Sequence, residues 1–338
     1  MRALPQVLAT AAALCLTLTA CSSGGASGGP ATATPSGGVT AAAGPSFHAP
    51  LNKPADLKVL DQVKVAETDP AKGPTLTFAA PISVTATAVK VLTPGTGATS
   101  TTDSLVTVKQ ALYVGGTGKL VDSAYTAKSP PSVFYTSDAQ TIPGLLTALT
   151  GVQKGSRVLF AIPPAEAFGD QGQTAASIGP KDDLVVVADV INVTLPQPEA
   201  KGTAVAPVAG QPAVTFAGGV PSIAIPAAPA PTSLVSQLLI DGTGPAVSAG
   251  QSVIVNYTGV VYATKTKFDS SWDRKTHFGF PTNAGAVIPG WDKGLVGKKV
   301  GSRVLLVIPP ADGYAATEKQ GIPANSTLVF VVDILAAA

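Results

Sequence analysis

The sequence predicts an α+β protein with two similar domains, each a curled antiparallel sheet wrapped on one short helix, joined by a Pro/Ala-rich linker. The first observation behind this is an internal repeat: residues 142–168 and 288–314 share 14 identities in 27 positions without a gap. Two copies 146 residues apart indicate duplicated domains, because solenoid repeats recur about every 20–50 residues. The second observation is a period of two in most apolar segments, which is typical of strands.

The composition limits the chemistry that the chain can perform. Its 338 residues are enough for two ordinary domains. A net charge of +2 with 12% charged residues excludes a nucleic-acid binder, which needs a clustered basic surface. Two cysteines exclude a disulfide framework, and two histidines do not readily build a zinc site or a His-dependent catalytic site. We therefore expect no metal site. No feature of the sequence implies an organic cofactor, and we expect His277 at the surface without a role.

Residues 1–20 have the pattern of a secretory signal peptide, with Arg2 followed by a largely apolar run. The run ends Leu18-Thr19-Ala20-Cys21, which resembles the bacterial lipobox. We therefore expect a lipidated Cys21, a low-complexity tether over residues 21–74 and a location at the outer face of the cell membrane. The alternative is a chance cysteine after an ordinary signal, and whether residues 46–74 fold stays open.

Composition and repeat together predict the domain boundaries. The first domain covers residues 75–196 and the second covers residues 232–338, because the repeat extends upstream of the best-matched segments. Residues 197–231 contain seven prolines and no sustained period, which indicates an extended linker.

The sequence of the second domain predicts several strands and one helix. Residues 253–257 alternate as a strand, and Gly259 marks a bulge or a close approach of another chain segment. Residues 304–308 and 328–335 are further strands. Pro289-Gly290 open the helix, and Gly297 closes it.

Several motifs follow one another in the second domain. They are Val255-Asn256-Tyr257-Thr258-Gly259, Phe268-Asp269-Ser270-Ser271, Val287-Ile288-Pro289-Gly290-Trp291, Gly301-Ser302-Arg303, Ile308-Pro309-Pro310, Tyr314, Ile322-Pro323 and Thr327-Leu328-Val329-Phe330. In this order and spacing the domain resembles the FKBP-type (macrolide-binding) peptidyl-prolyl cis-trans isomerases over essentially its whole length.

The resemblance implies a half-barrel sheet wrapped on the helix, with an apolar pocket between them. Its implied catalytic residues are Asp269 and Tyr314 at the mouth, Trp291 as the floor and Ile288 through its backbone N–H. Its implied substrate-binding residues are Tyr257, Phe268, Arg274, Phe278, Val287, Ile322 and Phe330, with Arg274 bracing Asp269. The implied partners are proline-containing unfolded or flexible polypeptides and macrolides of the rapamycin class.

Each of these residues also has a purely structural interpretation. The aromatic residues on alternating strand faces would be core in any sheet, and Asp269 followed by two serines could end a strand in an Asx turn. Two departures from the family concern the loop after Tyr314. Ala315 stands where the family usually has glycine, and Gln320-Gly321 replaces a longer Gly/Pro-rich stretch.

The first domain keeps the framework and loses the aromatic residues. Gln110 stands at the position of Tyr257, Leu145 at that of Trp291, Phe168 at that of Tyr314 and Val186 at that of Phe330; the Phe-Asp-Ser-Ser equivalent is Val121-Asp122-Ser123-Ala124. We therefore expect this domain to be degenerate and catalytically weak or silent.

The resemblance and the lipobox together imply a lipid-anchored isomerase that assists folding of exported proteins, with catalysis in the second domain. Two other hypotheses remain. The chain could be a non-catalytic holdase chaperone or envelope adaptor that uses the same apolar pocket. It could also be a surface lipoprotein recognised by a host or partner cell, which no feature beyond the anchor favours.

Overall fold

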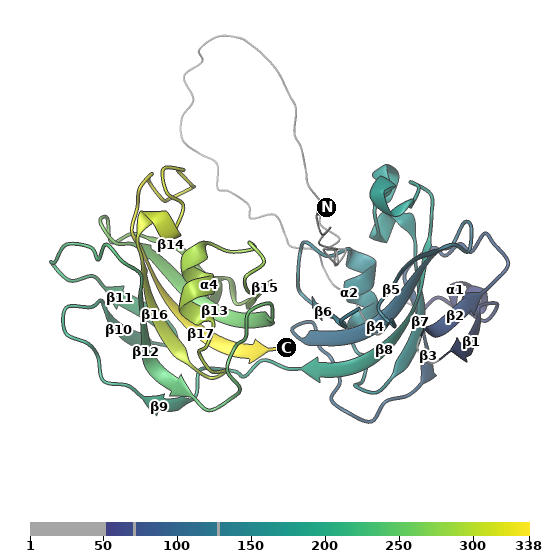
Figure 1. The fold of residues 1–338 in the computed structure, drawn as a ribbon, viewed down its shortest axis with the longest axis horizontal. Coiled ribbons are helices and arrows are strands. Elements are labelled where there is room, and N and C mark those ends of the chain that lie inside the picture. The colour runs from purple at the N-terminus through teal and green to yellow at the C-terminus, as the bar shows by residue number, and fades with distance from the viewer. Residues whose placement is uncertain (1–51, 70–71, 127–128) are drawn as a thin grey trace, which may run out of the picture.

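The computed structural model describes residues 52–69, 72–126 and 129–338 (Figure 1). The predicted signal peptide, Cys21 and most of the predicted tether lie outside the described residues. Figure 1 shows two domains side by side, with the C-terminus between them. In this part of the chain, the structure contains no helix with the length and hydrophobicity needed to cross a membrane.

The first domain is one antiparallel sheet curled around a short helix. Its strands follow the order β3-β7-β8-β4-β5, and β6 pairs with β4. The bounds are β3 Ala88–Thr93, β4 Leu105–Val114, β5 Leu120–Ser123, β6 Ser132–Tyr135, α2 Pro143–Leu149, β7 Arg157–Ile162 and β8 Leu184–Thr194. Three 3-10 turns, Pro164–Glu166, Gly169–Gln171 and Thr174–Ala176, connect β7 to β8.

The second domain repeats this plan. Its strands follow the order β14-β13-β17-β16-β12-β9, and β15 pairs with β13. The bounds are β9 Gly202–Ala204, β12 Val235–Gly242, β13 Ser252–Val261, β14 Lys267–Ser270, α3 Ser271–Arg274, β15 Phe278–Pro281, α4 Pro289–Leu295, β16 Arg303–Ile308 and β17 Leu328–Ala337, with a 3-10 turn at Pro310–Asp312. The predicted strands and helix are confirmed, and Gly297 follows the helix with a φ of +84°.

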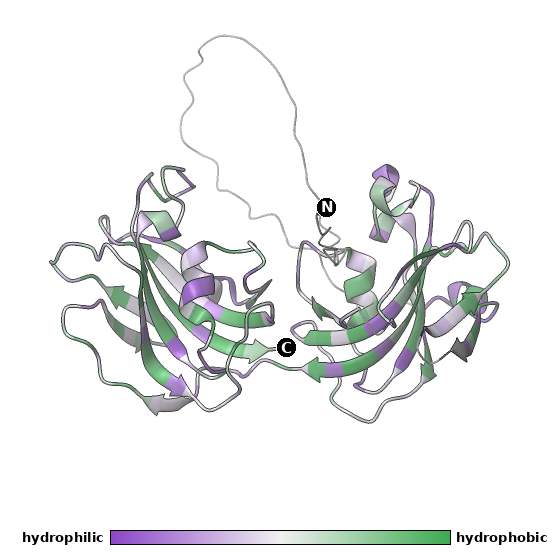
Figure 2. Cartoon of the chain, in the orientation of Figure 1, coloured by the Kyte–Doolittle hydropathy of each residue, from purple (hydrophilic) through white to green (hydrophobic). Residues whose placement is uncertain are grey.

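Each sheet buries an apolar layer against its helix. Trp291 and Leu295 of α4 lie in one cluster with alternate residues of β13, among them Val253, Val255 and Tyr257. In the first domain Leu145 and Leu149 of α2 pack in the same way on β4 and β7. Figure 2 shows that the strands of both sheets are mainly hydrophobic. The opposite face of each sheet is also buried. Nearly every residue of β13 and β17 is buried in the second domain, and Leu159, Val185 and Val187 are buried on that face in the first.

A hairpin covers the outer face of each sheet, at opposite ends of the molecule in Figure 1. In the first domain, α1 (Pro54–Leu60), β1 (Lys64–Asp69) and β2 (Gly73–Thr77) do so, with Leu60 and Leu76 packed on the sheet. Residues 54–69 and 72–77 are therefore folded, whereas we predicted that the tether continued to residue 74.

The predicted linker is part of the second domain rather than a free extended segment. Its strands β10 (Ala213–Ala217) and β11 (Val220–Ala224) form the second covering hairpin, and β9 joins the sheet edge beside β12. Ile225 is buried against Leu305 and Val331 of the sheet. The seven prolines misled the prediction because they lie mostly between these short strands, where their missing N–H groups cost no hydrogen bond in the sheet.

The two domains share a small apolar interface. Leu105 and Tyr135 of the first domain pack with Ile254, Leu335 and Ala336 of the second in one buried cluster. The Tyr135 ring lies over Gly279, where a Cβ atom would come within 2.3 Å of the ring. Only glycine at position 279 therefore permits this contact.

A polar group of three residues borders the interface. The Tyr135 hydroxyl donates to Asp103 Oδ1 at 2.7 Å, and His277 Nδ1 contacts the other carboxylate oxygen of Asp103 across the domain boundary. Burial and the adjacent Asp103 carboxylate raise the pKa of Tyr135. His277 is thus a contact between domains and not a surface residue without a role.

We predict that Tyr135→Ala uncouples the domains. The substitution removes an aromatic ring from a buried contact, which costs about 3 kcal/mol or more. The expected results are a lower denaturation midpoint and a larger radius of gyration by small-angle X-ray scattering. Tyr135→Phe is the control, because it keeps the ring and loses one hydrogen bond of about 1 kcal/mol. Wild-type values for both variants would contradict the interface.

Candidate active site

A pocket of about 150 Å³ opens on the concave face of the second domain, between the sheet and the start of α4. It is lined by side chains from four strands, the helix and two loops. They are Tyr257, Phe268, Asp269, Phe278, Ala286, Val287, Ile288, Trp291, Tyr314 and Phe330. The structure thus brings together nine of the eleven site residues predicted in this domain. The remaining two are Arg274 and Ile322.

Trp291 forms the floor of the pocket and is 4% exposed. Tyr257 and Phe330 meet its ring nearly at right angles, each with 5.2 Å between ring centroids. Phe280 packs on it from a third side at 5.4 Å. We did not predict Phe280, although its position two residues after Phe278 on a strand places both rings on one face. These edge-to-face contacts fix the indole in one orientation.

The indole nitrogen of Trp291 has no hydrogen-bond acceptor among the described residues. A buried donor without a partner is costly, so its retention in an otherwise apolar floor is unusual for a residue that serves packing alone.

Gly259 makes room for the aromatic walls. A Cβ atom at this position would lie 2.5 Å from Phe268 Cζ and 2.7 Å from Phe330 Cε1. The sequence predicted a bulge or a close approach here, and the structure has both, because the register of β13 against β14 shifts after Gly259. Any larger residue would displace one of the two rings.

Asp269 is the acidic group at the pocket mouth, and two donors hold it. The Tyr257 hydroxyl and Arg274 Nη1 both donate to its carboxylate, and Arg274 Nη2 lies 3.0 Å from the Tyr257 hydroxyl. Burial and then the hydrogen bond to Asp269 raise the pKa of Tyr257 to about 12. The tyrosine therefore stays protonated as a donor, and Arg274 braces Asp269 as the resemblance implied.

Two further donors at the mouth are unoccupied. The backbone N–H of Ile288, at the N-cap of α4, has no acceptor in the described part of the chain, and neither does the Tyr314 hydroxyl. Burial and the charge of Asp269 raise the pKa of Tyr314, so its hydroxyl also keeps its proton. The pocket thus presents two hydrogen-bond donors beside an apolar cavity.

Ile322 is buried in the same hydrophobic cluster but does not line the pocket. Ala315, immediately after Tyr314, has a φ of +50°. Its carbonyl accepts from the Asn325 N–H at 2.7 Å, which ties the two ends of this loop together. A left-handed φ explains why glycine suits this position.

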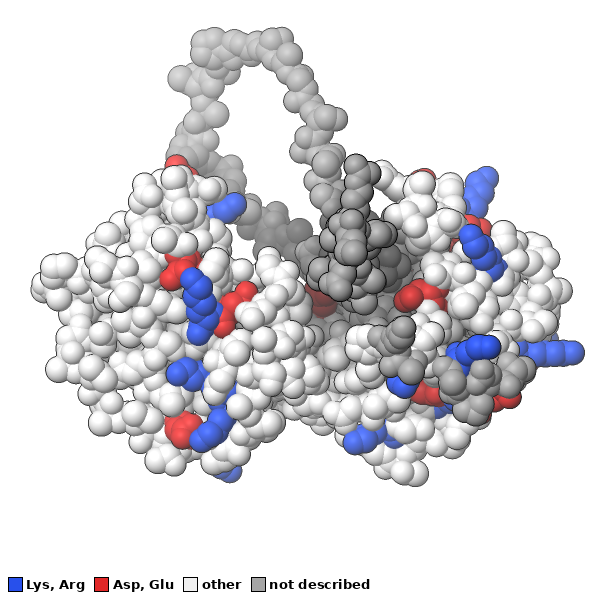
Figure 3. All heavy atoms as spheres, viewed as in Figure 1, with Lys and Arg blue, Asp and Glu red and all other residues white. Residues whose placement is uncertain are grey.

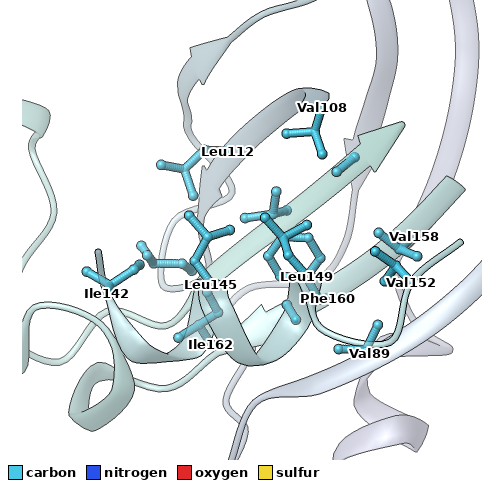
Figure 4. Close-up of a cluster of buried hydrophobic side chains, with 14 of the residues drawn as sticks. Val89, Val108, Leu112, Ile142, Leu145, Leu149, Val152, Val158, Phe160 and Ile162 are labelled. Carbon is cyan, nitrogen blue, oxygen red and sulfur yellow. The ribbon is translucent and has the colours of Figure 1, made fainter. Parts of the chain in front are cut away.

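The first domain does not carry these aromatic walls at the equivalent positions. Val186 lies opposite Phe160 and Leu112, as Phe330 lies opposite Leu306 and Gly259 in the second domain. Leu112 therefore occupies the space that Gly259 leaves to the rings of Phe268 and Phe330, and it is buried with Leu145 (Figure 4). Phe168 packs against the same cluster.

Charged groups of both signs alternate over the face of the molecule in Figure 3, with no large area of one sign. Among the described residues, no group of three or more His, Cys, Asp or Glu side chains is placed to hold a metal ion. The pocket itself presents an apolar surface and the donors named above.

Comparison with known proteins gives one family for both domains. Residues 97–189 and residues 244–335 match the family described as FKBP-type peptidyl-prolyl cis-trans isomerase. The FK506-binding protein of Streptomyces anulatus is 41% identical over 128 residues, which are 37% of this chain and 96% of that protein. The probable FK506-binding protein of Corynebacterium glutamicum is 43% identical over 118 residues, 35% of this chain and 98% of that protein.

Among solved structures, the three FKBP domains of wheat FKBP73 match with 22% sequence identity and a TM-score of 0.32. The match covers 75% of this chain and 94% of that one.

We predict that Ala315→Gly stabilises the loop after Tyr314. Glycine removes the left-handed strain of about 1–2 kcal/mol, and the greater freedom of the unfolded chain offsets about half of the gain. The thermal midpoint of unfolding should therefore rise slightly. Ala324→Gly is the matched control, because Ala324 is exposed in the same loop without a positive φ, and this variant should lower the midpoint. Equal midpoints for the two variants would contradict the strain.

Proposed function

The chain belongs to the family of FKBP-type peptidyl-prolyl cis-trans isomerases, and from this premise we propose that its second domain isomerises X–Pro bonds of exported polypeptides at the outer face of the cell membrane. Its substrates are unfolded or flexible segments. One observation carries the assignment of catalysis to this domain: an indole-floored pocket whose mouth holds two donors that have no acceptor among the described residues.

The reaction needs neither a covalent intermediate nor a proton transfer. Rotation about an X–Pro bond has a barrier of about 18–20 kcal/mol and takes tens of seconds or more without a catalyst. At the top of this barrier the bond is twisted, amide resonance is lost and the carbonyl is less polar. An enzyme accelerates the rotation when it binds this twisted form better than either planar form.

The apolar pocket favours the twisted form. A proline ring placed on Trp291 loses its water shell and gains contact with Tyr257 and Phe330, which surround the indole. Removing water disfavours the more polar planar amide relative to the twisted one. The apolar aromatic walls thus both bind the proline ring and favour the twisted form of the bond before it.

The donors at the mouth orient the flanking chain. The Ile288 N–H and the Tyr314 hydroxyl bind carbonyl groups on either side of the rotating bond, which holds both ends while the bond turns. Asp269 acts electrostatically on the changing carbonyl dipole, and its bonds to Tyr257 and Arg274 keep its carboxylate in place. Arg274 is therefore a positioning residue.

Macrolides of the rapamycin class would compete for the same pocket. This follows from the family and from relatives that are named as FK506-binding proteins. The first domain serves as a spacer, substrate arm or docking surface without catalysis, because Leu112 and Leu145 stand where the second domain has Gly259 and Trp291.

The location rests on residues outside the described part of the chain. A signal-like run that ends in a lipobox-like Cys21 supports lipid anchoring, and the polar, small-residue stretch after it is suited to a tether.

We predict that Asp269→Ala and Trp291→Ala in the full chain each lower kcat/KM for proline isomerisation by about ten-fold or more, since each loses an interaction worth at least about 1.4 kcal/mol in the transition state. A protease-free assay with a proline-containing peptide measures the rate. Asp122→Ala is the matched control, because it changes the equivalent exposed carboxylate of the first domain, and its rate should equal that of the wild type.

Two results would contradict these assignments. Wild-type rates for both Asp269→Ala and Trp291→Ala would remove the active site from this pocket and favour a holdase that binds chains without turnover. A loss of rate in Asp122→Ala would place catalysis in the first domain instead.

We predict separately that Cys21→Ala releases the protein from the membrane, since no acylated residue would remain to hold it there. Fractionation of expressing cells measures this, and the variant should move to the soluble or secreted fraction. Membrane association equal to that of the wild type would show that Cys21 is not the anchor.

A further inference from the structure

A second pocket, of about 330 Å³, lies on the opposite face of the second domain's sheet, beneath the β10–β11 hairpin. Its walls combine aromatic, charged and amide side chains. They are Pro198, Glu199, Phe216, Gly219, Asn256, Trp272, Arg303 and Asp333. None of these residues lines the pocket above Trp291. The two pockets are therefore separate, and β13 and β17 contribute lining residues to both.

Arg303 is the central cation of this second pocket, and only part of its guanidinium is used. Nε and Nη2 donate to the two oxygens of Asp333 at 2.6 and 2.7 Å, and Asp333 is almost completely buried. Phe216 covers one face of the guanidinium, 3.6 Å from the ring centroid. Nη1 has no acceptor among the described residues, although a guanidinium carries five donor hydrogens.

Asn256 adds a second donor to the same wall. Its Oδ1 accepts from the Ser271 hydroxyl at 3.0 Å, which orients the amide and directs Nδ2 elsewhere. No described residue accepts from Nδ2. The pocket thus contains two unused N–H groups beside two aromatic rings.

The first domain shows what such an arginine binds. Arg157, equivalent to Arg303, donates to Asp189 in the same two-pronged way at 2.6 and 2.8 Å. Its Nη1 donates to the carboxylate of Glu67, which β1 brings across the outer face. In this domain an acidic side chain on an extended strand therefore accepts the hydrogen bond from the remaining nitrogen of the guanidinium.

The hairpin of the first domain packs closely at the corresponding position. Gly73 lies so close to Tyr125, the residue equivalent to Trp272, that a Cβ atom would come within 2.1 Å of the ring. In the second domain Phe216 takes the side of the arginine that faces the hairpin and supplies no acceptor, and a pocket remains.

We propose that this pocket binds the carboxylate of an acidic side chain in an extended polypeptide, with Arg303 Nη1 and Asn256 Nδ2 as donors. The carboxylate takes the place that Glu67 fills in the first domain. Trp272 and Phe216 contact the apolar atoms beside it. Glu199 at the exposed rim opposes the incoming charge, so binding is weak and becomes stronger when this residue is neutral.

The test uses the indole N–H signals of the full chain in an NMR titration. The chain has two tryptophans, Trp272 in this pocket and Trp291 in the other, so each signal reports one pocket. The probe is the peptide Ac-Ala-Glu-Ala-NH2, with Ac-Ala-Gln-Ala-NH2 as its neutral control. We expect a saturable shift of the Trp272 signal with the acidic peptide, and about ten-fold weaker binding of the neutral one.

Three variants test the proposal further and leave the buried Arg303–Asp333 ion pair unchanged. Glu199→Gln should tighten binding of the acidic peptide about two- to five-fold, whereas Glu318→Gln, at another exposed position, should not. Phe216→Glu should abolish binding, since the carboxylate introduced at position 216 would itself accept the hydrogen bond from Arg303 Nη1. Equal binding of the two peptides, an unchanged Trp272 signal, or a shift confined to Trp291 would each overturn the proposal. These outcomes do not depend on isomerase activity.

Discussion

The burial of strand β13 on both of its faces is the constraint on which the rest of the second domain depends. Successive side chains of a strand point to opposite faces, and every residue from Val253 to Val261 is buried. Tyr257 consequently reaches the concave pocket, Asn256 reaches the pocket beneath the hairpin and Ile254 reaches the other domain. The alternation thus directs three side chains to three separate places, and a shift of one residue would turn each of them to the opposite face.

The duplication shows how one fold can hold either an open or a filled concave face. At one register position the second domain has Gly259, which leaves room for Phe268 and Phe330, and the first domain has Leu112. The aromatic walls and the small residue form one unit: rings without the glycine would not fit, and the glycine without the rings would leave a void. The first domain has exchanged all members of this unit and keeps its core closely packed.

Sequence patterns predicted the elements and most of the pocket because these depend on short-range rules. Period-two alternation identified β13, β-rich apolar runs identified β16 and β17, and Pro289 and Gly297 delimited α4. Matching motifs predicted that Asp269, Trp291 and Tyr314 line one cavity. Phe280 was missed because the motif treated each aromatic residue singly, whereas the strand period requires Phe278 and Phe280 to share a face.

The covering hairpins and the domain interface could not be predicted in the same way, because both depend on which surface a segment meets. Strands β10 and β11 have five residues each, which is too short for a period that distinguishes a strand from an extended linker. The segment forms a strand pair where it packs on the sheet that buries Ile225. Asp103 and His277 are 174 residues apart, so nothing local relates them. Burial against distant residues therefore decides the structure of the Pro-rich segment over residues 197–231. The same segment encloses the Arg303–Asp333 ion pair, and it provides no acceptor for Arg303 Nη1.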